Sequence, residues 1–416
     1  MGTERSQVGE ALGATLELVP SGGVTIPAGF TAGGIHVGVR TDWDKLDVGI
    51  VASAAPCVAA ATYTQNRVPG ASLIISKQHL SNARAQAIVA NAGCANAATG
   101  QRGIDDAINM AQLTAKKLGI DPHDVVVAST GVIGTFLPMD RIAGGIEQVA
   151  LTEGGGLDFA TAIMTTDTVS KHLAVRSSRG WTIGGVVKGV GMIHPNMATM
   201  LCFITTDAAV DSAFLAASLK RSVDVSFNMI DVDSDTSPDD IALVLANGLA
   251  GGVPIDVGHP DAGAFEKALE VVCITLARKM VADAEGSTKV IEATVEGAAS
   301  VDDARKAARE IVRSVGVKTA IYGEDANWGR VLSAVGNSGA AVVEEKVVLY
   351  FQGPAGKEVC VFHGAPLEYD AAEAKSCLTP AEVHIRVQMG LGDGSATAWG
   401  SDMTEEFVRL NSVYTT

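Results

Sequence analysis

Short apolar runs that alternate with helix-like patterns place the tightest constraint on how this chain folds. Four runs are bounded by turn residues and have the composition of buried strands: GIVAS (49–53), ASLIIS (71–76), AIVANAG (87–93) and DVVVASTG (124–131). Between and after such runs, apolar residues recur at intervals of three and four, as on one face of a helix. The alternation predicts a mixed α/β fold.

The clearest predicted helix is DDAINMAQLTAKKLG, residues 105–119. Asp105 or Asp106 suits its N-terminus, and Gly119 suits its C-terminal end. Comparable patterns occupy SAFLAASLKRSV (212–223), residues 264–286 and VDDARKAAREIVRSVG (301–316). A further stretch, VVLYFQGPAGKEVCVFHG, alternates like a hairpin around a Gly-Pro turn.

The 416 residues suffice for two or three compact units, but no low-complexity linker separates them. Weak boundary candidates are the glycine-rich stretch near Gly155 and the Gly/Pro-rich segment 245–260. We expect one continuous body. Aromatic residues make up only 5% of the chain and Gly occurs 46 times, so cores are expected to consist of Ala, Val, Ile and Leu with close backbone approach.

Charge and cysteine pattern exclude several classes of function. The net charge of −16 and the lack of a basic stripe argue against nucleic acid as a partner. The six cysteines include no CxxC pair, and neither they nor the eight histidines have metal-site spacing, so reduced thiols and no metal are expected. The longest weakly polar run, residues 49–62, is short for a membrane span, and the first residues do not resemble a signal peptide. We therefore expect a soluble cytoplasmic protein.

The most distinctive stretch is KGVGMIHPNMATML, residues 188–201. A threonine hydroxyl is a weak nucleophile unless a base lies beside it, and cleavage of the chain just before Thr199 would supply one as a new α-amino group. That amine titrates near pH ~8 in a peptide, within the range of a general base. The small Ala198 leaves its carbonyl open to attack. Taken alone, the pattern fits the start of a buried strand better than a nucleophile.

Segments along nearly the whole chain share a resemblance to one known family. TQNRVPGAS, STGVIGTFLPMD, KGVGMIHPNMATML, VKTAIYGEDANWGR and the closing segment that ends in NSVYTT resemble, in this order along nearly the whole chain, segments of the ornithine acetyltransferase family, the glutamate N-acetyltransferases of the ArgJ type. The resemblance implies a DmpA/ArgJ-like self-processing α/β fold with two lobes. It also implies cleavage between Ala198 and Thr199, giving an α chain (1–198) and a β chain (199–416).

The same resemblance assigns roles to individual residues. Thr199 corresponds to the nucleophile, and Thr130 with the backbone N–H of Gly131 corresponds to the oxyanion hole. The remaining matches are substrate contacts: Thr165, Lys188, Thr199, Glu285, Asn411 and Thr416. Read without the family, Lys188 is a surface lysine, Glu285 is a solvated residue near a helix end, and the C-terminus is frayed.

The implied activity is a ping-pong transfer of the acetyl group from N2-acetylornithine to glutamate through an acetyl-threonine, in arginine biosynthesis. No cofactor is implied, and the resemblance leaves open whether acetyl-CoA also serves as donor. An α2β2 heterotetramer is the implied assembly. Two alternatives remain: an aminopeptidase or amidase of the same fold, in which water accepts the acyl group, and an unprocessed binding protein.

The stretch DVDSDTSPDD, residues 231–240, imitates the start of a calcium-binding EF-hand loop. It lacks two required features, because Thr236 replaces the glycine and Ala242 stands where the bidentate glutamate belongs. The ArgJ type usually has a Thr-Asn pair where this chain has Pro238 and Asp239, so the role of this loop is in doubt. His194 is close to Thr199 but is expected to be structural, since an N-terminal amine makes a histidine base unnecessary.

Overall fold

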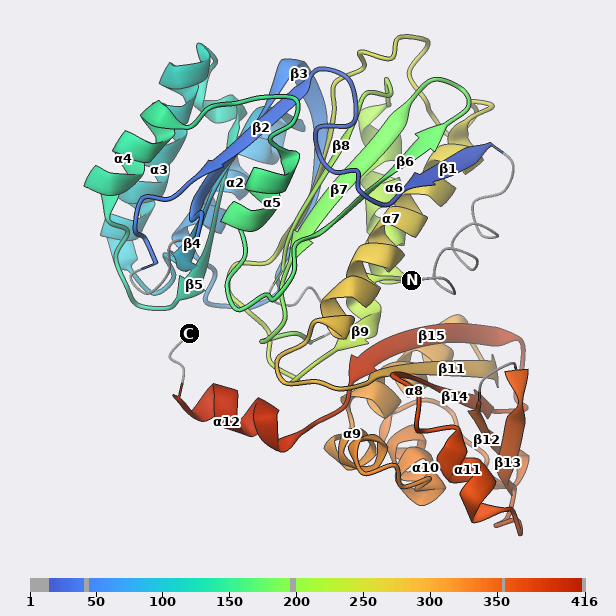
Figure 1. The fold of residues 1–416 in the computed structure, drawn as a ribbon. Coiled ribbons are helices and arrows are strands. Elements are labelled where there is room, and N and C mark those ends of the chain that lie inside the picture. Colours follow the sequence, from blue (N-terminus) through green and yellow to red (C-terminus); the bar gives the residue numbers. More distant parts are fainter. Residues whose placement is uncertain (1–14, 41–44, 195–199, 354–355, 414–416) are drawn as a thin grey trace.

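The computed structural model describes residues 15–40, 45–194, 200–353 and 356–413. The described residues form two β-sheets, one above the other in Figure 1, each with its own helices. Within the described chain, nine strands form the first sheet, in the order β1-β6-β7-β8-β10-β3-β4-β5 with β2 paired to β3. They are β1 (Leu16–Val19), β2 (Phe30–Ile35), β3 (Val48–Tyr63), β4 (Arg84–Cys94), β5 (Val125–Val132), β6 (Lys171–Ser177), β7 (Thr182–Lys188), β8 (Leu201–Thr206) and β10 (Ile241–Ala246).

Helices cover the first sheet on both sides. Contacts place α2 and α3 against β5, α5 against β2 and β3, and α6 and α7 against β3, β6 and β7 (Figure 1). Their bounds are α2 (Ala71–His79), α3 (Gly100–Leu118), α4 (Met139–Gln148), α5 (Gly156–Ala162), α6 (Ser212–Asp224) and α7 (Ala262–Ala282). This three-layer packing buries nearly every side chain of β7, β8 and β10.

The second sheet has the order β13-β12-β14-β11-β15-β9 in the part of the chain that the structure describes. Its strands are β9 (Ile230–Asp231), β11 (Val290–Ala298), β12 (Val348–Gln352), β13 (Glu358–His363), β14 (Glu382–Gln388) and β15 (Gly394–Ser401). Its helices are α8 (Val301–Arg313), α9 (Val315–Tyr322), α10 (Trp328–Asn337), α11 (Ala371–Ser376) and α12 (Glu405–Val413). Helix α8 packs against β11 and β15.

Helix α7 joins the two sheets into one body. Its apolar side chains recur every three or four residues and are fully buried: Phe265, Leu269, Val272, Leu276 and Met280. One hydrophobic core contains these residues together with side chains of β7, β8, β11 and β15. The change from one sheet to the other follows α7, so it lies at neither of the glycine-rich boundary candidates.

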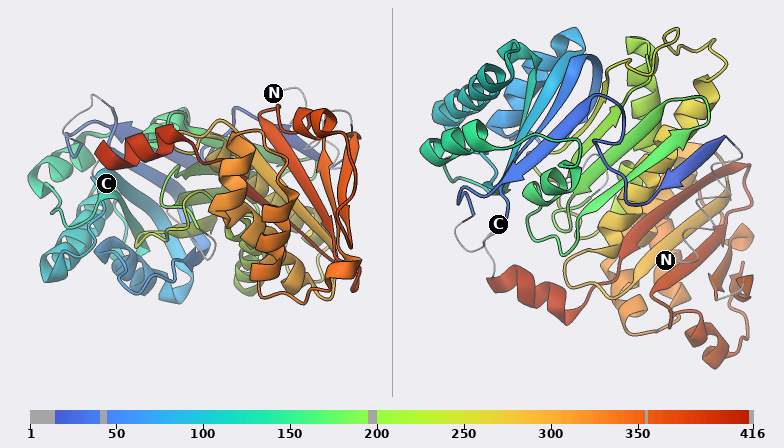
Figure 2. Two further views of the ribbon diagram at one scale, coloured as in Figure 1. Left: turned by 90° about the horizontal axis from the view of Figure 1, so that it is seen from below. Right: turned by 45° about the horizontal axis from the view of Figure 1, so that its top comes forward.

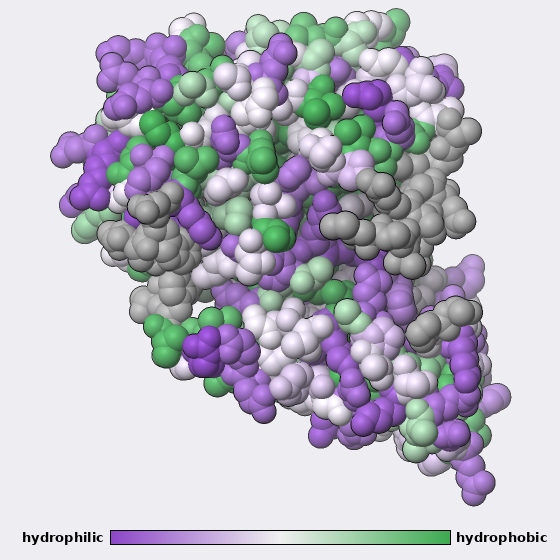
Figure 3. All heavy atoms as spheres, in the orientation of Figure 1, coloured by the Kyte–Doolittle hydropathy of each residue, from purple (hydrophilic) through white to green (hydrophobic). Residues whose placement is uncertain are grey.

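Helix α12 leaves the second sheet and reaches back toward the first. Both views in Figure 2 show this helix, drawn in red, extending away from the second sheet toward the first. The Thr404 hydroxyl donates to the Gly286 carbonyl at 2.6 Å and fixes its starting point. Hydrophilic side chains gather along the region between the two sheets, called here the waist (Figure 3). Helix α12 lies at this waist.

Two predicted elements differ from the structure. ASLIIS is not a strand but part of α2, and Ser72 and Ser76, one turn apart, both face β5: Ser72 Oγ lies 2.6 Å from Ser129 Oγ and Ser76 Oγ donates to the Val127 carbonyl at 2.6 Å. A six-residue apolar run does not distinguish a strand from a buried helix. Helix α3 begins at Gly100, one turn earlier than Asp105.

The remaining predictions of secondary structure are confirmed. GIVAS, AIVANAG and DVVVASTG lie in β3, β4 and β5, and the three other predicted helices are α6, α7 and α8. Gly119 ends α3 in the left-handed conformation, with its N–H bonded to the Ala115 carbonyl. Strands β12 and β13 form the predicted antiparallel hairpin. All six cysteines are free thiols, five of them buried. Among the described residues, no helix is long and apolar enough to cross a membrane.

Candidate active site

A cavity of about 340 Å³ lies where the carboxyl ends of β4, β5 and β7 meet the waist. It collects every predicted site residue that lies in the described part of the chain: Thr130, Gly131, Thr165, Lys188, Glu285 and Asn411. These residues come from segments as far apart as β5 and α12. Ala198, Thr199 and Thr416 lie outside the described residues. Their roles, and the role of each residue in the cavity, stay predictions.

Thr130 and Gly131 form the end of β5 at the cavity wall. Gly131 has φ +127°, and a side chain there would bring its Cβ within 2.4 Å of the Gly93 carbonyl carbon, so only glycine fits. The Thr130 hydroxyl accepts a hydrogen bond from Lys188 Nζ at 3.1 Å. Because Thr130 is the acceptor, its own hydroxyl proton can be donated to an oxygen atom in the cavity. This chemistry suits the predicted oxyanion hole.

Lys188 ends β7 and is buried at 2% exposure. Burial lowers the pKa of its ammonium below the ordinary value, and the carboxylate of Asp167 offsets part of that effect. The interpretation of Lys188 as a surface lysine is therefore wrong. A buried ammonium at the wall of a polar cavity is suited to an anionic group of a ligand.

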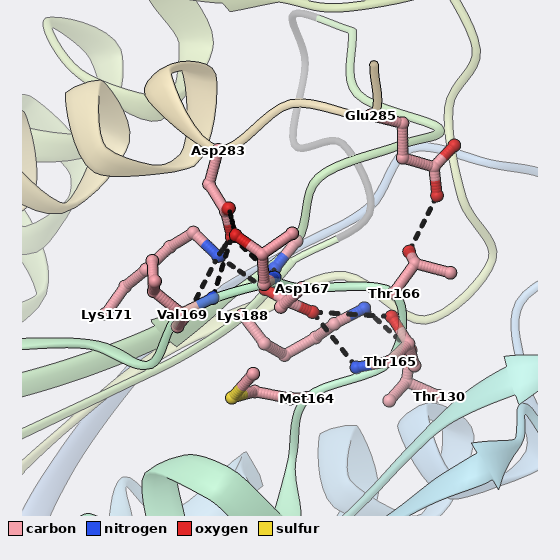
Figure 4. A network of polar contacts seen from close by, with 12 residues as sticks. Thr130, Met164, Thr165, Thr166, Asp167, Val169, Lys171, Lys188, Asp283 and Glu285 are labelled. Atoms are coloured by element: carbon pink, nitrogen blue, oxygen red, sulfur yellow. Dashed lines mark hydrogen bonds and ion pairs between the residues drawn. The ribbon is translucent and has the colours of Figure 1, made fainter. Parts of the chain in front are cut away.

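Asp167 organises a buried charge network behind the cavity wall (Figure 4). Its Oδ1 accepts from Lys171 Nζ at 2.7 Å and from the Gly189 N–H at 2.9 Å, and its Oδ2 accepts from the Thr165 N–H at 3.0 Å. Lys171 Nζ also donates to Asp283 at 2.5 Å. Burial opposes ionisation of Asp167, but Lys171 and Lys188 outweigh it and lower its pKa to about 2. The network ties three cavity-lining segments together.

Thr165 is held from its carbonyl side as well. Arg40 donates from Nη1 to the Met164 carbonyl at 2.6 Å and from Nη2 to the Thr165 carbonyl at 2.5 Å. Arg40 is 5% exposed and itself lines the cavity. A buried guanidinium that bonds two successive carbonyls fixes the main chain between them.

Glu285 lies apart from this network and next to Thr166 (Figure 4). Its carboxylate accepts from the Thr166 hydroxyl at 2.6 Å and from Asn411 Nδ2 at 3.0 Å. The Glu285 N–H donates to the Val190 carbonyl at 3.0 Å, which places the residue beside the segment that follows β7. The C-terminal helix α12 thus reaches the cavity at Asn411.

Asp239 adds a second carboxyl group on the side of Lys188. It lines the cavity, is 6% exposed, and its Oδ1 has no hydrogen-bond partner among the described residues. Burial raises its pKa well above the ordinary value, and Lys188 offsets only part of that rise. Burial therefore disfavours the charged form of the Asp239 carboxyl group.

Known proteins resemble this chain along nearly its whole length. It matches the ArgJ family over residues 31–416. A protein of Symbiobacterium thermophilum, named arginine biosynthesis bifunctional protein ArgJ, is 49% identical over 402 residues, which cover 95% of this chain and 99% of the relative.

This chain belongs to the ArgJ family.

Other similar proteins carry related names. The arginine biosynthesis bifunctional protein ArgJ of Dehalococcoides mccartyi is 45% identical over 97% of this chain and 99% of its own length. A solved ornithine acetyltransferase of Mycobacterium tuberculosis, complexed with ornithine, is 38% identical, covers 45% of this chain and 100% of its own, and has a TM-score of 0.43. The family resemblance and the mixed α/β fold predicted from the sequence are confirmed.

The ArgJ motifs did not reveal the residues that support the site. Asp167 and Lys171 are four residues apart in TTDTVSK, and this proximity of opposite charges is the one local sign of their ion pair, because the segment is a loop that leads into β6 and not a helix. Asp283 and Arg40 gave no comparable signal. Their partners, Lys171 for Asp283 and Met164 and Thr165 for Arg40, lie more than 100 residues away along the chain.

Proposed function

We propose that this ArgJ-family chain is a self-processing acetyltransferase of arginine biosynthesis. It transfers the acetyl group of N2-acetylornithine to glutamate through an acetyl ester on Thr199, after cleavage between Ala198 and Thr199. The observation that carries the proposal is the cavity itself, in which a buried ammonium, Lys188, and a carboxylate, Glu285, line the same space beside the Thr130 hydroxyl. Relatives that match nearly the whole chain are named for arginine biosynthesis.

The first half-reaction forms the acetyl ester. The Thr199 hydroxyl oxygen attacks the acetyl carbonyl carbon, the amide C–N bond breaks, and the hydroxyl proton passes by way of the Thr199 α-amine to the leaving amine of ornithine. Negative charge develops on the carbonyl oxygen, where Thr130 and Gly131 donate hydrogen bonds. Each such donor is commonly worth ~3 kcal/mol.

The second half-reaction reverses these steps with glutamate. Its amine attacks the ester carbonyl, the C–O bond to Thr199 breaks, and the threonine oxygen regains a proton. Both ligands are charged amino acids, so the cavity must hold a carboxylate in each half-reaction. Lys188 supplies the buried positive charge for it, while Glu285, held by Thr166 and Asn411, faces the cationic side chain of ornithine.

The active protein in this proposal is an α2β2 heterotetramer in the cytoplasm, built from residues 1–198 and 199–416. It uses no cofactor for the exchange. Acetyl-CoA is proposed as an additional donor for glutamate, because the relatives are named bifunctional.

Product analysis tests the function. Purified protein is incubated with N2-acetylornithine and glutamate, then with acetyl-CoA and glutamate, and the products are identified by mass spectrometry. N-acetylglutamate from the first mixture supports the proposal. Acetate formed at the same rate with and without glutamate would instead indicate hydrolysis by an amidase of this fold. An intact chain with no turnover would favour a binding protein.

A further inference from the structure

The loop of residues 231–240, called here the acidic loop, contacts the chain on both sides of the predicted cleavage site. Its carboxylates imitate a calcium site in the sequence, yet in the structure they accept hydrogen bonds from main-chain N–H groups and a histidine. The described residues on either side of the cleavage site are Met192 to His194 before it and Met200 after it.

The upstream side is held by two carboxylates. Asp233 accepts from the Met192 N–H at 2.5 Å and from the Ile193 N–H at 2.8 Å, one bond to each oxygen. Asp231 contacts His194 Nδ1 at 2.9 Å, which agrees with a structural role for this histidine. Met192 has φ +57°, a left-handed conformation that non-glycine residues adopt only when their surroundings fix it.

The downstream side is held in the same way by the other end of the loop. Asp240 Oδ1 accepts from the Met200 N–H at 2.8 Å, and the Met200 carbonyl accepts from the Ile241 N–H at 3.1 Å. Strands β8 and β10 then run parallel from Leu201 and Ile241 onward. The residue that follows Thr199 is therefore fixed at the start of a buried strand.

An ion pair and hydrogen bonds connect the acidic loop to elements next to both sheets. Lys318, fully buried, approaches Asp231 Oδ1 at 3.2 Å from α9. On the other side, Thr64 donates to the Ser237 carbonyl at 2.7 Å, and the Gly70 N–H donates to the Pro238 carbonyl at 3.1 Å. The TQNRVPG motif, which has no role in the cavity, thus supports this loop.

We propose that the acidic loop positions the cleavage segment for self-processing, with Asp233 and Asp240 as positioning residues on its two sides. This inference rests on the proposed function. In the reaction, the Thr199 hydroxyl oxygen bonds to the Ala198 carbonyl carbon, the peptide C–N bond breaks, and the released α-amine takes the hydroxyl proton. Water then hydrolyses the resulting ester.

The physical reason is conformational. Attack on the preceding carbonyl requires a contracted backbone, which an unrestrained segment adopts rarely. Fixing both ends of a short segment to one loop removes most of the alternative conformations before the reaction begins. Each hydrogen bond that is lost should therefore slow the cleavage, while the folded state loses only one loop contact.

The test follows cleavage in freshly synthesised full-length chain, sampled over time on denaturing gels and by mass spectrometry. The variants are Asp233→Asn, which keeps one acceptor oxygen, and Asp233→Ala, which keeps none. We expect cleavage about tenfold slower in Asp233→Asn, equivalent to about 1.4 kcal/mol, and slower again in Asp233→Ala. Asp370→Ala is the matched control, because Asp370 also accepts from two main-chain N–H groups, at the start of α11 in the second sheet.

A second pair of variants, at Asp240, tests the inference independently if an Asp233 variant fails to fold. Asp240→Asn keeps an oxygen for the Met200 N–H, whereas Asp240→Ala does not, so the first should cleave faster than the second. Thermal unfolding of each uncleaved variant checks that it is folded. Folded Asp233 variants that cleave at the wild-type rate would overturn this inference alone. A wild-type chain that stays intact would overturn the proposed function and this inference together.

Discussion

Removal of the buried charge of Asp167 should destabilise the charge network behind the cavity wall. Asp167 lies between two buried ammonium groups, Lys171 and Lys188; Asp283 also pairs with Lys171, and two further carboxyl groups, Asp239 and Asp240, act on Lys188. In Asp167→Asn, Lys171 keeps its pair with Asp283, whereas Lys188 loses the largest of the negative charges that act on it. The difference between an aspartate pKa of 3.8 and the pKa of about 2 in the folded protein corresponds to roughly 2 kcal/mol of stability at neutral pH. Broken buried pairs cost about 3–5 kcal/mol, so we expect a loss of at least about 2 kcal/mol.

The pH dependence gives this prediction its sign. Because the folded-state pKa of Asp167 is lowered, its contribution is present above about pH 4 and is lost as the pH falls toward 2. The asparagine variant does not titrate in this window. The deficit of Asp167→Asn relative to wild type should therefore be full at pH 7 and should begin to shrink below about pH 4.

Urea unfolding at about pH 7, 5 and 3 measures the effect as a shift in midpoint. Asp140→Asn, an exposed carboxylate in the first turn of α4, is the control and should change stability by less than about 0.5 kcal/mol. The double variant Asp167→Asn with Lys171→Met restores the balance of buried charge and should recover part of the loss. The reasoning is refuted if Asp167→Asn unfolds with the Asp140→Asn control, or if the double variant is no more stable than Asp167→Asn.

Three further outcomes concern activity. Thr130→Val removes an oxyanion donor and should lower kcat about 100-fold or more, with a smaller change in KM, in steady-state acetyl transfer; an unchanged kcat would count against the oxyanion role. Glu285→Gln should raise KM for N2-acetylornithine more than for glutamate, because only the former has a cationic side chain; equal effects on both would contradict this. A tag added after Thr416 should weaken activity, since Asn411 already contacts Glu285; kinetics identical to those of the untagged protein would argue against closure by the C-terminus.

Elements with a strong period were predictable from the sequence, whereas the division into sheets was not. Helix α7 was predictable from apolar residues that recur at intervals of three and four. Strands β4 and β5 were predictable from apolar runs between turn residues. The boundary is hidden because α7 packs on both sheets and because β9, far upstream of β11, pairs with β15 in the second sheet. No composition change accompanies such a shared core. Helix α2 was not predictable because its short apolar run fits a strand equally well, and the bonds of Ser72 and Ser76 to β5 depend on tertiary structure.

The residues of the candidate site likewise fall into those that were predictable from the sequence and those that were not. Motifs carried over from the ArgJ resemblance point to residues that face the cavity, such as Lys188 and Glu285. The residues that hold them were missed, since a contact such as Lys171 with Asp283 spans 112 positions and leaves no local pattern. No calcium site was predicted for the acidic loop, and no sequence pattern indicated the loop's bonds to Met192, Ile193 and Met200, because these depend on tertiary structure alone.

Denaturing mass spectrometry of the protein after brief mixing with N2-acetylornithine, without glutamate, tests the central claim most directly. The account predicts two fragments, one beginning at Thr199, and an added mass of one acetyl group on the amino-terminal peptide of that fragment, which disappears when glutamate is added. An active protein in which the chain is intact, or in which the acetyl group is found on another residue, would contradict it.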